Sequence, residues 1–211
     1  MKLAVWSPLP PSSSGIADYV SEQLPLLAEA ARLQVVVEEP AAVRPDLRDR
    51  FQVVAPQDRD AGALDLYHLG NSPPHAYVYR AALDRPGVAV LHEWSLHHLV
   101  LHETVEKGQA WEYLREMRRA HGARGAFVGR QVARALGGNL LPALFALNER
   151  VLEASLAVVG LTHHVAARAR ARLPGRPVLH LPHHASLPLA PLPNRAQARA
   201  ALGLPPDALL V

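Results

Sequence analysis

The sequence contains no cysteine, so neither a disulfide bond nor thiolate chemistry is available to it. It also has no uninterrupted apolar run of about 18 residues, which excludes a membrane-spanning helix. The apolar stretch at residues 1–6 is too short for a secretory signal peptide and is more typical of a strand. Together these absences favour a cytoplasmic location.

Lysine is nearly missing, because Lys2 and Lys107 are the only two in 211 residues. The net charge of +3 therefore comes almost entirely from arginine, whose planar guanidinium suits phosphate and carboxylate groups. So small an excess, with no recognised nucleic-acid motif, argues against nucleic acid as a partner. An apolar content of 49% with 19% charged residues predicts a folded chain rather than a disordered one.

Short apolar, β-branched runs alternate with helical patterns along the chain. Several runs are continuous, as expected for strands that are buried on both faces of a parallel sheet. We therefore predict an α/β fold with a Rossmann-like, doubly wound, mainly parallel sheet of about seven strands. In such a sheet, ligands bind beyond the carboxyl ends of the strands. The predicted strands are 3–6, 34–37, 51–54, 64–69, 87–91, 156–161 and 177–181.

Residues 104–155 interrupt this alternation with a helical insertion that we divide into two or three helices. Arginines lie among apolar residues such as Trp111 and Phe127, a mixture that suits contact with an anionic membrane surface. An ordinary solvated helix face with a buried stripe explains the same pattern. The insertion is therefore a candidate for peripheral membrane contact.

The last part of the sequence is typical of a domain junction. Residues 186–193 are rich in proline and leucine, as in a linker, and 195–203 predict a short helix with Gly203 at its C′ position. A new strand is expected at 208–211. We therefore expect an N-terminal domain over residues 1–185, and in 186–211 a linker and the start of a C-terminal domain.

The first stretch, MKLAVWSPLPPSSSGIADY, combines a short strand, a loop of small residues and the start of an amphipathic helix. The unpaired N–H groups of a helix beginning at Gly15 would form a cradle for an anion such as a phosphate. Ser14 is the expected N-cap, and Pro25 is expected to bend the helix or end its regular hydrogen bonding. An ordinary strand-to-helix connection explains these residues equally well, because neither common nucleotide-binding glycine pattern is present.

Twelve histidines are many for this length, and some of them follow predicted strands. His92 and Glu93 come directly after a buried strand, where the sites of α/β proteins collect, and we expect both to face substrate. A neutral imidazole at such a place can donate a hydrogen bond to a hydroxyl or to a developing charge. Asn71 and His75 follow another strand in the turn LGNSPPH and are expected at the same sheet edge as Gly15.

The segment HEWSLHH invites a metal interpretation, but its spacing is H-E-x-x-x-H rather than H-E-x-x-H. His98 and His102 can share a helix face, yet no third ligand is placed with them. We therefore expect no metal site, and we interpret these two residues and His97 as a capped or partly buried helix face. The pairs at 163–164 and 183–184 are interpreted as polar residues at strand ends.

Taken in order, several segments resemble the N-terminal half of the retaining glycosyltransferases of family 4: SPLPPSSSGIADY, YHLGNSPPH, GVAVLHEWSLHHL, VVGLTHHVAARARARLP and VLHLPHH. The resemblance covers essentially the whole chain, and the closing RAQARAALGLPPDALLV resembles the usual junction before the second domain. It implies the GT-B architecture, in which two Rossmann-like domains face each other across a cleft. It also implies sugar transfer from a nucleotide-sugar donor to an acceptor hydroxyl with retention, without a metal or other cofactor.

The resemblance implies roles for individual residues. Gly15 matches the glycine whose backbone lies near the donor diphosphate, and Asp18 matches the acceptor side of the cleft. His92 matches the histidine that faces the transferred sugar, which makes it the expected catalytic residue. Asn71 and His75 fall in the loop that shapes the acceptor pocket, and we expect the helical insertion to border the acceptor site. The groups that grip the nucleotide belong to the family's second domain, so this chain alone is expected to be inactive.

Two other functional classes stay open. A non-catalytic binding module would use the same cleft, or the basic helices, to dock a partner or a membrane surface. A metal-dependent hydrolase is the third class. An acidic motif and a Lys/Arg pair in the second half of the full-length sequence would favour the transferase over the binding module. The expected location is the cytoplasm, with the inner face of the membrane as a candidate peripheral site.

Overall fold

The computed structural model describes residues 1–134, 136–138, 140–184 and 192–209. Within this part of the chain, a single seven-stranded sheet has the order β3-β2-β1-β4-β5-β6-β7, and every pairing is parallel. The sequence-based prediction of a Rossmann-like, doubly wound α/β fold is confirmed. The strands are β1 (Lys2–Trp6), β2 (Arg32–Val36), β3 (Gln52–Val54), β4 (Leu64–Leu69), β5 (Val88–Leu91), β6 (Ala157–Gly160) and β7 (Val178–His180).

The centre of the sheet explains why the strand sequences are continuous apolar runs. Val5 in β1 lies opposite Val35 in β2 and Leu66 in β4, and its side chain is fully buried. Its neighbours Ala4 and Trp6 point to the other face and are buried there. Because helices cover both faces, neither side of β1 tolerates a polar surface.

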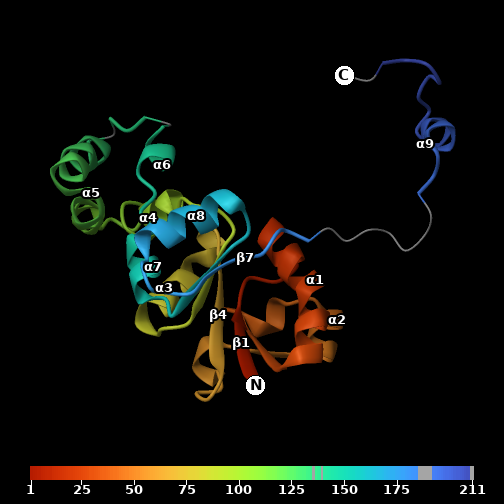
Figure 1. The fold of residues 1–211 in the computed structure, drawn as a ribbon, viewed down its shortest axis with the longest axis horizontal. Coiled ribbons are helices and arrows are strands. Elements are labelled where there is room, and N and C mark those ends of the chain that lie inside the picture. Colours follow the sequence, from red (N-terminus) through yellow and green to blue (C-terminus); the bar gives the residue numbers. More distant parts are fainter. Residues whose placement is uncertain (135, 139, 185–191, 210–211) are drawn as a thin grey trace.

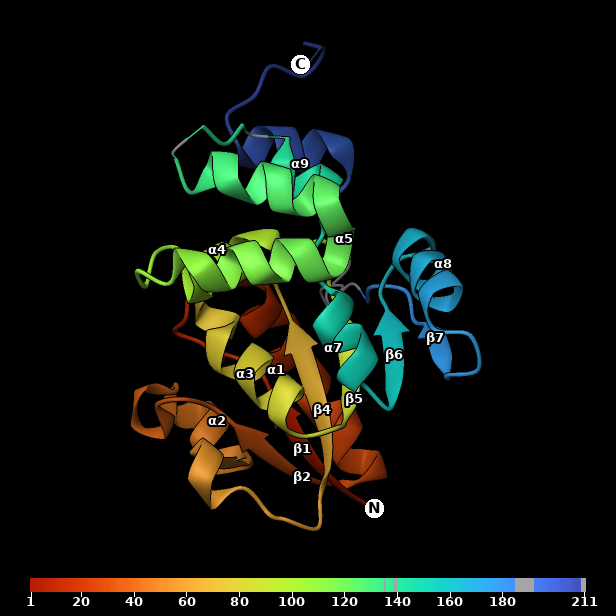
Figure 2. The ribbon, with the colours of Figure 1, turned by 90° about the vertical axis from the view of Figure 1, so that its left-hand side faces the viewer.

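Helices pack against both faces of the sheet (Figures 1 and 2). On one face, α1 (Gly15–Ala30) and α2 (Pro45–Arg50) contribute Val20, Leu24 and Leu47 to a cluster around Val5. The other face carries the larger cluster, around Trp6. Its helices are α3 (Ala76–Asp84), α4 (His97–Glu103), α5 (Ala110–Val132), α7 (Glu149–Ala154) and α8 (His163–Arg172). Short 3₁₀ turns are η1 (Pro40–Ala42), η2 (Pro56–Asp58) and η3 (Pro73–His75).

Helix α1 is the element that positions the first loop. It continues through Pro25 to Ala30. The sequence predicts that Pro25 either bends the helix or ends its regular hydrogen bonding, and the helix does not end there. Burial of Leu24 against the sheet holds the helix in place although the proline lacks an N–H donor. Ser14 occupies the N-cap position with extended backbone angles, but its side chain makes no capping hydrogen bond.

The helical insertion consists of α5, α6 (Leu141–Leu144) and α7 in the described residues. Gly122 has a φ of 59°, which reverses the direction of α5 and divides it into two segments that Figure 2 shows one above the other. The two segments approach closely, because a Cβ on Gly125 would lie 1.9 Å from the carbonyl oxygen of Met117. With α5 divided at Gly122, the described part of the insertion has four helical segments, one more than the two or three predicted from the sequence.

After β7 the chain contains one further helix in the described part, α9 (Arg195–Ala201). Asn194 and Gln197 form a reciprocal capping box at its start, and Gly203 follows its end with a φ of 65°. Ala208 and Leu209 do not form the expected strand, and the remaining two residues of 208–211 lie outside the described residues. Much of the expected linker, 185–191, also lies outside them.

Candidate functional site

The carboxyl edge of the sheet collects the polar residues that the sequence singles out. Strand β1 leads into the loop that ends at Ser14, β4 leads to Asn71 and His75, and β5 leads to His92. Because β1, β4 and β5 are neighbours in one parallel sheet, these segments meet at one edge. The expectation that they share a sheet edge is therefore confirmed.

His92 is bonded to a second imidazole that the sequence did not single out. Its Nε2 lies 3.1 Å from Nδ1 of His68, which belongs to β4 and is 1% exposed. Burial lowers the pKa of His68 to about 3 and moves the pKa of His92 still further below its usual value, with the neighbouring imidazoles adding to the shift. Both rings are therefore neutral at pH 7, and a single proton occupies the bond between them.

The surroundings of His68 decide which ring supplies that proton. Its Nε2 is buried and has no hydrogen-bond partner among the described residues. If His92 donated, this atom would carry a buried N–H without an acceptor, which is rarer in folded proteins than an unused lone pair. The favoured arrangement places the proton on His68 Nδ1. His92 then accepts at Nε2 and carries its own proton on Nδ1, where it is a hydrogen-bond donor.

Tyr19 of α1 forms the other side of the His92 environment. Its ring meets His92 edge-on at 5.0 Å between centroids and lies 4.2 Å from His183 and 4.4 Å from His184. His184 also contacts the Glu22 carboxylate through Nε2 at 3.0 Å. The histidine pair after β7 therefore packs on the helix that begins at the first loop, and is more than a polar strand end.

His75 is fully buried, so it reaches a ligand only through another group. Its Nδ1 lies 3.1 Å from the carbonyl oxygen of His68 and its Nε2 lies 3.2 Å from Ser14 Oγ. Since a carbonyl only accepts, Nδ1 carries the proton, and burial lowers the pKa of His75 to about 4, which keeps the ring neutral. The Ser14 hydroxyl must therefore donate to His75 and leaves only lone pairs for anything else.

The hydrogen bond from the Ser14 hydroxyl to His75 Nε2 explains why the Ser14 side chain does not cap α1. The N–H groups of Ala17 and Asp18 donate to the Ser14 carbonyl, whereas those of Gly15 and Ile16 have no intrahelical carbonyl within reach. A Cβ on Gly15 would meet nothing within 4 Å. The helix start is therefore open and uncapped by a side chain, as a cradle for an anion requires. Asp18, one turn further on, is exposed.

Asn71 and Glu93 form a structural tie at the same edge. Asn71 accepts a hydrogen bond at Oδ1 from the Leu99 N–H at 3.1 Å, which supplies a cap to the first turn of α4. The backbone N–H of Asn71 donates to Glu93 Oε1 at 3.2 Å. Asn71 is half-buried and Glu93 is exposed, so of the two only Glu93 offers a largely free side chain.

The other histidines of the HEWSLHH region lie apart from this site. His97 is buried, with Nδ1 2.6 Å from the Phe145 carbonyl oxygen and Nε2 3.1 Å from the Tyr113 hydroxyl. His98 is exposed, and His102 contacts Glu106 at 2.8 Å. In the part of the chain that the structure describes, no three His, Cys, Asp or Glu side chains gather as a metal site would need.

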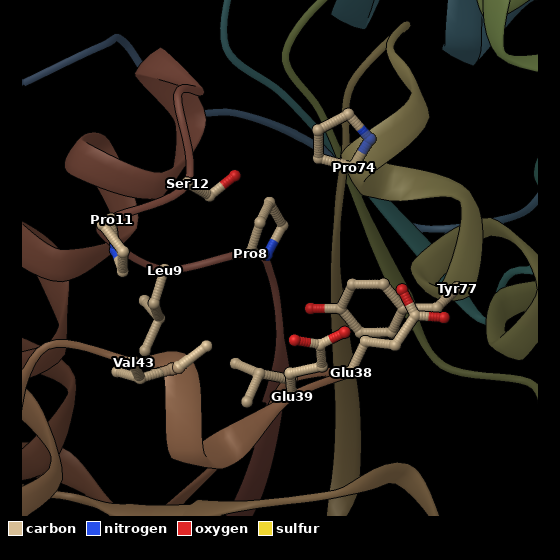
Figure 3. A pocket seen from close by; sticks show the side chains of 11 residues that line it. Pro8, Leu9, Pro11, Ser12, Glu38, Glu39, Val43, Pro74 and Tyr77 are labelled. Carbon is tan, nitrogen blue, oxygen red and sulfur yellow. The ribbon is translucent and has the colours of Figure 1, made fainter.

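A pocket of about 340 Å³ opens beside the first loop, at the ends of β1 and β2 (Figure 3). Prolines, aliphatic side chains and Tyr77 form most of its wall, and Glu38 and Glu39 supply its charge. The sequence gives no sign of this pocket, since the two glutamates follow β2 without a motif around them. Its lining residues are Pro8, Leu9, Pro11, Ser12, Val37, Glu38, Glu39, Ala42, Val43, Pro74 and Tyr77.

Comparisons with known proteins gave no match: no family model, no curated protein and no solved structure is similar to this chain. Within the described residues, no helix has the length and apolar character needed to cross a bilayer.

Proposed function

We propose that this chain is the N-terminal, acceptor-side domain of a retaining glycosyltransferase with the GT-B architecture. The observation that carries the proposal is the neutral His92, held by His68 at the end of β5. The open start of α1 lies at the same sheet edge. A nucleotide-sugar reaction needs a hydrogen-bond donor near the sugar and an anion-binding site for the diphosphate, and this sheet edge offers both. The motifs quoted above, in their order along the chain, point the same way.

In this mechanism the donor diphosphate is the leaving group. The N–H groups of Gly15 and Ile16 face its negative charge, which increases as the bond to the sugar breaks. His92 donates from Nδ1 to the sugar while charge develops. The acceptor hydroxyl attacks on the face from which the diphosphate departs, and its proton passes to the departing diphosphate oxygen. His68 fixes the tautomer of His92, and the mechanism needs no metal or other cofactor. The cationic groups that complete the diphosphate site belong to a second domain.

The test is sugar transfer by the full-length protein, assayed with UDP- and GDP-sugars and a panel of hydroxylated acceptors. His92→Ala is expected to lower kcat by about 10²–10³-fold, since it removes one pre-oriented donor. His98→Ala is the matched control, because His98 is exposed on the neighbouring α4. Turnover of His92→Ala close to that of the parent, with an unchanged circular dichroism spectrum, would remove His92 from the mechanism.

A further measurement separates the domain from the whole protein. Calorimetry of this 211-residue chain with the same donors is expected to show weak binding, because backbone amides alone hold the diphosphate. Tight donor binding or transfer by the chain alone would place the donor site here and contradict the proposed division between two domains.

The second candidate function is a non-catalytic module that docks on a membrane surface or a partner. It is favoured by an exposed aromatic side chain on each segment of α5, since Trp111 and Phe127 are 59% and 57% exposed. Arg118, Arg124 and Arg130 are exposed on the same helix. This function predicts salt-sensitive sedimentation with anionic vesicles that Trp111→Ser weakens. Sedimentation equal to that with neutral vesicles would leave an ordinary solvated helix face.

A further inference from the structure

We propose that the pocket between the first loop and the segment after β2 binds a small hydroxylated ammonium compound, such as an amino sugar. The role of this compound as the acceptor rests on the proposed function, whereas its binding does not. The volume of about 340 Å³ lies within the range of small-molecule sites, roughly 300–1,000 Å³. Three separate chain segments converge on it, at the ends of β1, β2 and β4 (Figure 3).

The charge of the pocket is the first argument for a cation. Among the residues that the structure describes, only Glu38 and Glu39 bring charge to its lining, in a chain whose net charge is +3. Glu39 is exposed and makes no ion pair with any described residue. A negative hollow in a net basic chain favours an ammonium group over a phosphate or carboxylate.

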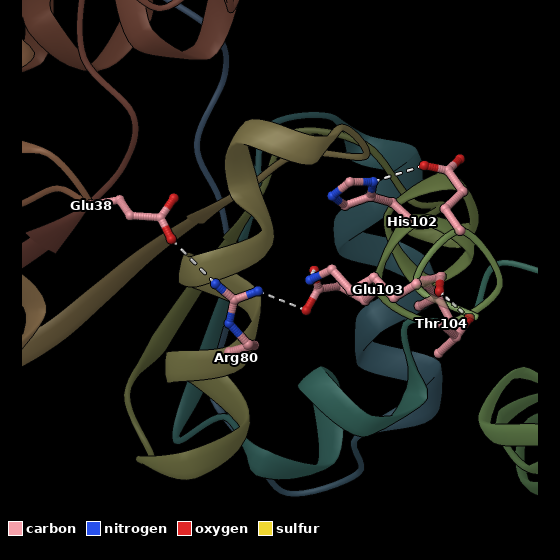
Figure 4. Close-up of polar contacts among 8 residues, drawn as sticks. Glu38, Arg80, His102, Glu103 and Thr104 are labelled. Carbon is pink, nitrogen blue, oxygen red and sulfur yellow. Dashed lines mark hydrogen bonds and ion pairs between the residues drawn. The ribbon is translucent and has the colours of Figure 1, made fainter. Parts of the chain in front are cut away.

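Glu38 is only weakly neutralised by the nearest arginine. Arg80 Nη2 lies 3.4 Å from Glu38 Oε1, whereas Arg80 Nη1 lies 2.8 Å from Glu103 Oε2 (Figure 4). The Glu38 side chain is 63% exposed and that of Glu103 is 11% exposed, so the shorter contact is also the better shielded one. Glu103 also pairs with Lys107, so Arg80 is shared between the two glutamates. The long contact of the exposed Glu38 carboxylate neutralises it only in part.

The walls of the pocket suit the ring of a sugar-sized ligand. Pro8, Pro11 and Pro74 fix the loops on two sides without backbone donors that would compete for the carboxylates. Tyr77 is almost buried and its hydroxyl donates to the Val36 carbonyl at 3.2 Å, so its ring is fixed as part of the wall. A fixed aromatic ring attracts both the C–H face of a sugar and an ammonium group.

The adjacent hollow shows that this charge is particular to the pocket. The second hollow, of about 430 Å³, shares Glu38 and Tyr77 but is also lined by Arg80, Asp84 and Arg85. Its acidic and basic side chains are equal in number, so it has no preference for a cation. The charge excess of the first pocket therefore comes from Glu39, which the second hollow lacks.

The pocket also lies where an acceptor would be needed. It is lined by Ser12, two residues before Ser14, and by Pro74, next to His75. These two segments meet in the hydrogen bond between Ser14 and His75. Strands β1 and β5 are two positions apart in the sheet, so His92 is about 10 Å from β1 along the same edge. The pocket therefore lies beside the His92 edge, and an acceptor bound there has to reach across that separation to react.

The experiment compares glucosamine with glucose and N-acetylglucosamine, which keep the ring but lack the ammonium group. Chemical-shift perturbation on this chain at pH 6.5 is expected to show glucosamine binding about fivefold more tightly than either neutral sugar. Glu39→Gln is expected to abolish that difference, whereas Glu29→Gln, an exposed glutamate on α1, leaves it unchanged. Ala42→Trp, at an exposed lining position, is expected to weaken binding of all three sugars.

Equal binding of the three sugars, or a preference for glucosamine that survives both Glu39→Gln and Ala42→Trp, would overturn the pocket assignment. Transfer assays with the full-length protein give a separate readout for the proposed function. Glucosamine binding without sugar transfer to any acceptor leaves the pocket standing and contradicts the transferase. Transfer to neutral acceptors alone, with no glucosamine binding, supports the transferase and contradicts the pocket assignment.

Discussion

His75 is fully buried and acts only through two hydrogen bonds. It bridges the His68 carbonyl and the Ser14 hydroxyl, and so joins the β4 loop to the start of α1. The direction of both hydrogen bonds follows from one fact, namely that a carbonyl oxygen cannot donate. The consequence for Ser14 is that its oxygen offers only lone pairs to any further group, which suits a ligand hydroxyl rather than a phosphate.

The variant His75→Asn tests the two hydrogen bonds of His75 separately, because it keeps the one to His68 and removes the one from Ser14. Its amide nitrogen sits where Nδ1 does and keeps the donor to the His68 carbonyl, but nothing reaches Ser14. Ser14 is then free to cap α1, which closes the anion cradle. We expect a KM for the nucleotide-sugar several-fold higher in the full-length protein, with kcat less affected.

Ser14→Ala is the comparison for that variant. It also breaks the bond to His75 but leaves no hydroxyl to occupy the helix start, so donor KM is expected to stay near that of the parent. If both variants raised the donor KM equally, the proposed competition for the helix start would be wrong.

The buried neutral histidines also set a pH dependence of stability. The pKa of His68 falls to about 3 and that of His75 to about 4, from a usual value of 6.5. Below pH 6.5 the unfolded chain binds protons at these positions while the folded chain does not, so stability falls with pH towards about 4. Each histidine contributes up to about 1.4 kcal/mol per pH unit in that window.

Urea unfolding at pH 7.5, 6.5 and 5.5 measures this effect. The free energy of unfolding is expected to fall only slightly from pH 7.5 to 6.5, where the histidines of the unfolded chain begin to bind protons. It is expected to fall further from pH 6.5 to 5.5. His75→Asn should show a shallower loss than the parent chain. A free energy of unfolding that did not change between pH 7.5 and 5.5 would contradict the burial of uncharged imidazoles.

At the scale of elements, the sequence predicts the strands well because each is a short apolar run between polar turns. All seven runs, from 3–6 to 177–181, correspond to strands in the structure. The partners across the site could not be predicted in the same way. The contact between His68 and His92 depends on strand order, and His184 reaches Tyr19 across 165 positions of sequence. A local sequence pattern does not predict a contact between residues so far apart in the sequence.

The approach of α8 to β6 gives a prediction at this scale. Gly160 ends β6, and a Cβ there would lie 2.7 Å from the backbone nitrogen of Ala166. Gly160→Ala is therefore expected to destabilise the fold by about 1–3 kcal/mol, because backbone rather than a flexible side chain must move. Gly15→Ala is the control, since the space around Gly15 is open. Equal unfolding midpoints in urea for the two variants would contradict this account.

At the scale of the whole molecule, one buried ion pair joins the two halves of the sheet. Asp65 in β4 accepts a hydrogen bond from Trp6 Nε1 in β1 at 2.7 Å and pairs with Arg59 through two contacts of 2.6 Å. The side chains of Arg59 and Asp65 are 6% and 1% exposed. The pair thus lies where β1 meets β4, two strands that are distant in sequence.

Asp65→Ala is expected to cost about 3–5 kcal/mol, because it leaves the Arg59 charge buried without a partner. Asp46→Ala removes the same kind of partner from Arg44 in an exposed pair and is expected to change stability little. The free energy of unfolding in urea measures both. A small effect of Asp65→Ala would show that water reaches Arg59.

The strand order has a consequence for the kinetics of folding. From β4 to β7, and from β1 to β3, each strand pairs with its neighbour in sequence. Only β1 and β4 break this rule, where Leu3 lies opposite Leu64. The β5–β6 pairing closes a loop of similar length, since Val88 lies opposite Ala157. Closing these two long loops costs entropy before any contact compensates, so the two pairings are expected to limit the refolding rate. During synthesis, the first strand must wait for the fourth to leave the ribosome before its second edge is covered.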